Sequence, residues 1–116
     1  MENGFKSLIV WQKSMALAEL VYVIVKKFPR SESFGLVSQI QRAAVSVPSN
    51  IAEGSRRSTR KDYAQFLSVA HGSLAELETQ LLLARNAYPS KEIEDALEIL
   101  GEISRMLHTL VRKLRT

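Results

Sequence analysis

The sequence contains no cysteine and only three prolines and five glycines among its 116 residues. Without cysteine the chain can form neither a disulfide framework nor a thiolate metal site, which suits a reducing compartment such as the cytoplasm. Apolar runs are short: the longest in helix-like sequence covers 20–25, whereas a membrane-spanning helix needs about 20 residues. The N-terminus has no basic stretch before a long apolar run, so we expect no signal peptide. These absences favour a cytoplasmic protein with one domain, residues 1–116.

Charge and composition restrict the function only loosely. Hydrophobic residues make up 46% of the chain, which is ordinary for a globular protein and argues against disorder. Sixteen Lys and Arg against twelve Asp and Glu give a net charge of +4. A mildly basic chain is compatible with a nucleic acid or another anionic partner, but many structural proteins share this balance.

Proline and glycine divide the chain into four segments, each with apolar residues three and four positions apart. This spacing predicts helices over 8–28, 34–52, 58–88 and 90–114. The third begins at Ser58 or Thr59, with Asp62 three residues after Thr59 as a modified capping box, and Ser90 caps the fourth. Pro48 lies inside the second helix, where we expect a kink or a break. The 3.5-residue period favours near-parallel packing, and short connections make consecutive helices antiparallel. The sequence therefore predicts an all-α protein, an up-down-up-down antiparallel four-helix bundle.

The first predicted helix carries more apolar surface than one bundle interior requires. One row includes Trp11, Met15 and Tyr22, and a second, about 100° around the helix, includes Leu17 and Ile24. Because both rows would need cover, we expect the protein to assemble as a homo-oligomer.

A polar stripe crosses the second helix and continues beside the apolar seam of the third. Its side chains are mostly short or amide-bearing, which favours a satisfied polar network between helices or subunits over a solvated face. We further predict that Arg42 and Glu76 form a buried pair across the two helices. The residues of this predicted network are Gln39, Arg42, Ser46, Asn50, Glu53, Ser73, Glu76 and Gln80.

Basic residues are concentrated between the second and third helices and at the C-terminus. In an up-down bundle this turn and both termini lie at one end, so these bases and Lys6 should gather there. A solvated turn is one interpretation, and a phosphate-binding face for nucleic acid is the other. Tyr63 and Phe66 are expected in the core, so we expect no base stacking. The predicted nucleic-acid-binding residues are Arg56, Arg57, Arg60, Lys61, Arg112, Lys113 and Arg115.

No pattern indicates catalysis, a metal or a cofactor. His71 and His108 have no metal-ligand companion at helical spacing, and we expect ordinary histidines on a helix surface or in a groove. The glycines are too dispersed for a phosphate-cradling loop, and no serine lies in a nucleophile elbow. We therefore expect a protein without catalytic residues, metal or cofactor.

The segment 39–54, QIQRAAVSVPSNIAEG, resembles the signature of the four-helix-bundle proteins encoded in intervening sequences of bacterial 23S ribosomal RNA genes. Further similarity lies in VWQK at 10–13, Phe28-Pro29 and GSLAELE at 72–78, so the resemblance covers roughly 8–88. The last helix matches only in character.

The resemblance implies a homopentameric ring or barrel without catalytic activity. It also implies a relationship to the accessory protein of diversity-generating retroelements, a basic pentamer that binds nucleic acid and a reverse transcriptase. Expected partners are thus the chain itself, RNA or DNA, and a reverse-transcriptase-like or ribosomal protein, but no membrane. Our leading hypothesis is a non-catalytic oligomer associated with RNA through its basic end. The alternative is a protein-binding scaffold or adaptor with no nucleic-acid role.

Overall fold

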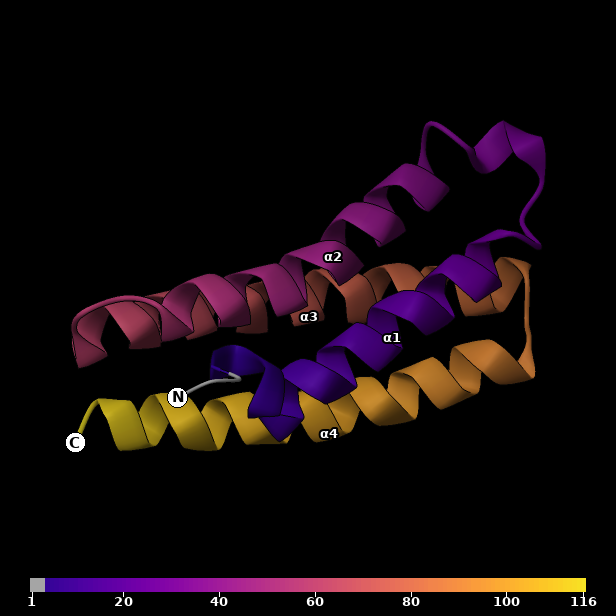
Figure 1. The fold of residues 1–116 in the computed structure, drawn as a ribbon. Coiled ribbons are helices and arrows are strands. Elements are labelled where there is room, and N and C mark those ends of the chain that lie inside the picture. The colour runs from indigo at the N-terminus through magenta and orange to yellow at the C-terminus, as the bar shows by residue number, and fades with distance from the viewer. Residues whose placement is uncertain (1–3) are drawn as a thin grey trace.

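A computed structural model describes residues 4–116 of the protein. Figure 1 shows a bundle in which each long helix runs opposite to the one before it. Each helix contacts its neighbour in the chain, and α1 also contacts α4, which closes the bundle. The elements are the short 3-10 helices η1 (Gly4–Ser7) and η2 (Arg30–Glu32) and the α-helices α1 (Ile9–Val25), α2 (Leu36–Ser55), α3 (Arg60–Ala87) and α4 (Lys91–Leu114).

Side-chain caps fix the starts of the last two helices as predicted. The Thr59 hydroxyl accepts a hydrogen bond from the backbone N–H of Asp62 at 3.1 Å, and the Ser90 hydroxyl accepts one from Ile93 at 3.2 Å. Each bond satisfies a backbone donor that has no partner within the helix. Other helix ends differ from prediction by a few residues: α1 ends at Val25, before Phe28, and α2 continues to Ser55.

The helix α2 is continuous through Pro48, so a break is excluded. Figure 1 shows the N-terminal half of α2 bending away from the line of its C-terminal half. A bend on the N-terminal side of Pro48 is expected, because a proline ring crowds the carbonyl group four residues earlier, here that of Ala44. Pro48 itself is buried. The proline therefore redirects the first half of α2 without ending the helix.

Only one of the two apolar rows of α1 faces the core along its whole length. Leu17, Val21 and Ile24 are at most 1% exposed and pack against buried residues of all the other helices. From the other row, Trp11 and Met15 are partly buried and Tyr22 is 45% exposed. The apolar sector of α1 is thus wider than the core, as predicted. No helix within residues 4–116 has both the length and the apolar character of a membrane span.

Candidate nucleic-acid interface

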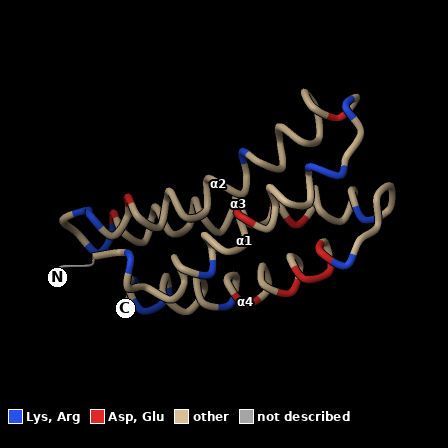
Figure 2. Tube along the Cα trace, turned by 45° about the vertical axis from the view of Figure 1, so that its right-hand side comes forward, with Lys and Arg blue, Asp and Glu red and all other residues tan. Residues whose placement is uncertain are grey.

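The bundle brings three separate basic segments to one end of the molecule (Figure 2). The turn between α2 and α3, the last turn of α4 and η1 meet there, and the acidic half of α4 lies towards the opposite end. In segments 4–7, 53–62 and 112–116 the only acids are Glu53 and Asp62. The bases in these segments are Lys6, Arg56, Arg57, Arg60, Lys61, Arg112, Lys113 and Arg115. We call this set the basic end.

Arg60 joins the start of α3 to the end of α4. Its Nη2 donates to the carbonyl oxygen of Lys113 at 2.7 Å, and its Nε donates to that of Leu114 at 3.4 Å. Carbonyls in the last turn of a helix have no intrahelical partner, so the guanidinium satisfies acceptors that would otherwise face water. Part of the Arg60 donor set is therefore committed to the fold.

Two arginines of the turn lie on aromatic rings, and one of these rings, that of Phe66, was expected in the core. The Arg57 guanidinium lies 4.5 Å from the ring centroid of Phe66, and that of Arg56 lies 5.4 Å from the ring of Phe5. Phe66 is only partly buried and lies outside the core cluster, whereas Tyr63 packs against the core as expected. Arg57 also donates to Glu53 at 2.6 Å. The rings and the carboxylate hold these two arginines in place.

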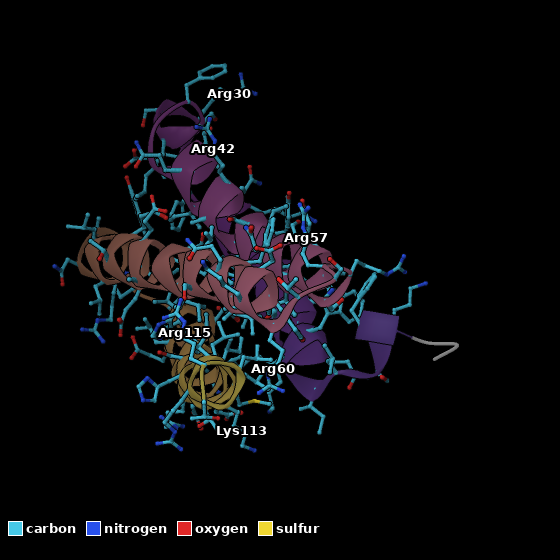
Figure 3. All side chains as sticks on the ribbon, turned by 90° about the vertical axis from the view of Figure 1, so that its left-hand side faces the viewer. Arg30, Arg42, Arg57, Arg60, Lys113 and Arg115 are labelled. Carbon is cyan, nitrogen blue, oxygen red and sulfur yellow. The ribbon has the colours of Figure 1, made fainter. Side chains whose placement is uncertain are left out.

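The outermost bases of this end are exposed to water. Within residues 4–116, no ion pair involves Lys61, Arg112 or Lys113. Figure 3 looks onto this end and shows Arg57, Arg60, Lys113 and Arg115 around it, while Arg30 and Arg42 lie elsewhere along the bundle. Lys6, Lys61, Arg112 and Lys113 are therefore exposed cationic groups that lie outside these ion pairs.

Three residues of the predicted polar network, Ser46, Asn50 and Ser73, are hydrogen-bonded between α2 and α3. The hydroxyl oxygens of Ser46 and Ser73 lie 2.8 Å apart, and Asn50 Nδ2 donates to both the carbonyl oxygen and the hydroxyl of Ser46, at 2.8 and 3.0 Å. Ser73 is 6% exposed, so its hydroxyl needs this partner. Glu53 does not join the network, because its carboxylate pairs with Arg57.

The predicted buried pair between Arg42 and Glu76 is wrong. Both side chains line one hollow of about 480 Å³ between α2 and α3, together with Gln39 and Gln80, but both are exposed. No ion pair joins them in the described part of the chain. The register was correct, but both long side chains extend to water, where their charges remain hydrated.

The two histidines lie near one another on the α3–α4 side of the bundle. His71 Nε2 is 2.9 Å from the hydroxyl oxygen of Ser104 and is partly buried, whereas His108 is exposed. Both line a hollow of about 530 Å³, next to Arg112 and Arg115. In residues 4–116, no three His, Asp or Glu side chains are grouped closely enough to hold a metal ion.

Comparison with known proteins identifies the family. The sequence profile described as 23S rRNA-intervening sequence protein matches residues 6–109. The chain belongs to this family. The 23S rRNA-intervening sequence protein profile covers nearly all of α1 to α4 and includes the segment 39–54.

A solved structure has the same fold. It is the crystal structure of a protein of unknown function from the S23 ribosomal protein family of Bacteroides thetaiotaomicron VPI-5482, with a TM-score of 0.81 and 24% sequence identity. The alignment covers 89% of this chain and 98% of the other. No curated protein is significantly similar to the chain. The chain thus shares the fold of a protein of unknown function, and its membership of the 23S rRNA-intervening sequence protein family does not by itself assign a function.

Sequence reasoning missed a close contact between α2 and α3 inside the family segment 39–54. Gly54 is buried, and a Cβ built on it would lie 2.7 Å from the Cβ of Phe66 and 3.3 Å from the carbonyl oxygen of Tyr63. Carbon atoms in contact normally lie about 3.5–4.0 Å apart. Gly54 therefore lets the end of α2 approach α3 just before the basic turn. The signal in the sequence for this contact was Gly54 itself, just after the predicted second helix, where a glycine is typical of a helix end.

Proposed function

We propose that the protein is a non-catalytic, homo-oligomeric nucleic-acid-binding protein whose basic end contacts phosphates of RNA or DNA without reading sequence. The convergence of bases from η1, the α2–α3 turn and the α4 terminus supports this proposal above all. Eight bases with two acids exceed what solubility requires at one end of a 13.0 kDa chain. Phosphate neutralisation by Lys and Arg supplies most of non-specific nucleic-acid affinity.

The distribution of contacts divides the basic end into two groups. Arg57 and Arg60 already bind protein acceptors, so they position the turn and contribute less to a ligand. Lys61, Arg112 and Lys113 are exposed and lie outside the ion pairs of the described residues, so they carry the proposed phosphate contacts. Arg56 lies over the ring of Phe5 and is exposed.

Self-association is the second part of the proposal, and the apolar groove between α1 and α2 supports it. Tyr22 is 45% and Val45 is 42% exposed, and both line a hollow of about 380 Å³ with Trp11, Met15 and Pro48. A subunit seated there would bury aromatic and apolar surface that faces water in one copy. Family resemblance favours a pentamer, in which five basic ends would combine through avidity.

Measurement of RNA affinity as a function of salt tests the nucleic-acid part. The triple variant Lys61→Gln, Arg112→Gln, Lys113→Gln should bind unrelated RNA sequences more weakly, with a less steep loss of affinity between about 50 and 200 mM salt. Each lost contact to single-stranded RNA should reduce the logarithmic slope by about 0.7. The matched control, Lys26→Gln, Arg30→Gln, Lys91→Gln, removes the same charge at the opposite end and should leave the slope nearly unchanged.

Equal affinity of the parent and the basic-end variant at low salt would reject Lys61, Arg112 and Lys113 as the phosphate contacts, and absence of RNA and DNA binding by the parent would reject the nucleic-acid part. Static light scattering on a sizing column tests the assembly, and a 13.0 kDa monomer at micromolar concentration would reject it. A defined oligomer that binds no RNA or DNA would instead favour the scaffold function. A reverse-transcriptase-like or ribosomal protein would then be a partner to test by co-purification.

A further inference from the structure

We infer that the hollow between α3 and α4 is a phosphate-binding pocket formed by two arginines and two histidines. The inference deepens the proposed function and rests on it, because Arg112 and Arg115 belong to the basic end. The pocket has a volume of about 530 Å³ and is lined by Ser68, His71, His108, Val111, Arg112, Arg115 and Thr116. We call it the histidine pocket.

Helix periodicity explains why these residues converge. On α4, His108, Arg112 and Arg115 follow one another four and three positions apart, so they lie along one face. On α3, Ser68 and His71 are three positions apart and lie opposite. Arg115 Nη2 donates to the Ser68 hydroxyl at 3.3 Å, which holds the two helices' side chains together at the edge of the pocket.

Every polar side chain that lines the histidine pocket can donate a hydrogen bond, and none is a carboxylate. Two guanidinium groups and two imidazoles therefore face one volume, and their donors match the several acceptor oxygens of phosphate. Of the two hydroxyls, that of Thr116 donates to the Lys113 carbonyl and that of Ser68 accepts from Arg115. The adjoining carboxylates along the chain are Asp62 and Glu76 on α3 and Glu102 on α4, and Glu102 already pairs with Lys13. Arg105, which precedes His108 by less than one turn, adds to the positive charge nearby.

Two further contacts make the pocket more favourable for an anion. The terminal carbonyls of a helix carry partial negative charge that would repel an anion near the end of α4. Arg60 binds two of these carbonyls, on Lys113 and Leu114. Ser104 contacts His71 Nε2, which leaves Nδ1 as the second ring nitrogen that can interact with a ligand.

Sulfate is a suitable probe of the pocket. It offers the same tetrahedral set of acceptor oxygens as phosphate, and it keeps one charge state near neutral pH, whereas inorganic phosphate does not.

The experiment uses the fact that the chain contains only two histidines. The imidazole proton resonances of the full-length protein are followed by NMR while sulfate is added at one fixed pH, with chloride of equal ionic strength as the control. We expect both resonances to shift saturably with sulfate, and Arg112→Gln with Arg115→Gln to abolish the shift. The pocket is rejected if neither resonance responds, or if chloride produces the same shift.

A second titration identifies the source of the phosphate group. Inorganic phosphate, a 5′-phosphorylated RNA oligonucleotide and its 5′-hydroxyl counterpart are compared at the same pH on the same resonances. Stronger binding of the phosphorylated strand assigns the pocket to a terminal phosphate, and equal binding with shifted imidazoles assigns it to the backbone. RNA that binds without moving either resonance rejects the pocket but leaves the proposed function standing. Sulfate shifts without any RNA binding retain the pocket and reject the proposed function.

Discussion

Replacement of Gly54 by alanine should destabilise the bundle, although alanine is the better helix former. Gly54 lies inside α2, where alanine would add up to about 1 kcal/mol of helix propensity. The new methyl carbon, however, would lie 2.7 Å from the Cβ of Phe66 and 3.3 Å from the carbonyl oxygen of Tyr63. Neither atom is at the end of a flexible side chain, so α2 and α3 must move apart.

The expected size follows from these two opposing terms. Overpacking of a fitted contact typically costs about 1–3 kcal/mol, which outweighs the propensity gain and leaves a net loss of about 1–2 kcal/mol. Gly72→Ala is the matched control, because Gly72 lies in the middle of α3 and a Cβ there would meet no atom within 4 Å. The same substitution at Gly72 should therefore stabilise the protein, by about 0.5–1 kcal/mol.

Thermal unfolding by circular dichroism, at one protein concentration for all variants, measures both effects. For a chain of this length, about 1 kcal/mol corresponds to about 4 °C in Tm, so the two variants should lie on opposite sides of the parent. A Tm for Gly54→Ala at or above that of the parent would refute the argument from close helix approach.

Three other changes test individual contacts. Lys13→Gln should raise the pKa of Glu102, which the hydrogen bond and charge of Lys13 hold below its ordinary value of 4.5, and carboxyl NMR titration measures this change. In the parent, the pair stabilises the fold above pH 4.5, and this stabilisation is lost as the pH falls through the folded-state pKa of Glu102. Glu32→Gln should lower the pKa of Tyr88 towards 10.0, because the Glu32 carboxylate accepts a hydrogen bond from the phenol hydroxyl at 2.9 Å and favours its neutral form. NMR titration of the Tyr88 ring signals measures this pKa. Thr59→Ala should destabilise the protein by about 1 kcal/mol in urea unfolding, since it removes the cap of α3.

The helices and the general position of the bases could be predicted because they depend on local patterns. Apolar spacing located all four helices, and the Thr59 and Ser90 caps start α3 and α4 as expected. Short connections place the α2–α3 turn beside both termini, so the basic end also followed from the sequence.

The contacts within the site depended on helix rotation and side-chain reach, which periodicity does not determine. Phe66 fits an apolar pattern, yet its position on α3 leaves the ring partly exposed beneath Arg57. Arg42 and Glu76 lie near the same level, but hydration of both charges is less costly than burial of the pair. The histidine pocket combines residues from two helices, and neither helix alone indicates it.

The position of η1 and the end of α4 at the same end of the bundle has a practical consequence for probes and purification tags. A tag joined close to η1 or to the end of α4 would lie beside the bases whose binding is to be measured, and a charged tag would alter their electrostatic field. The segment between α1 and α2 lies at the opposite end, where Ser31 and Ser33 are exposed. Because the chain has no other cysteine, a single Ser31→Cys substitution would give one site for a fluorophore. Such a label would report tumbling and binding from the far end of the bundle.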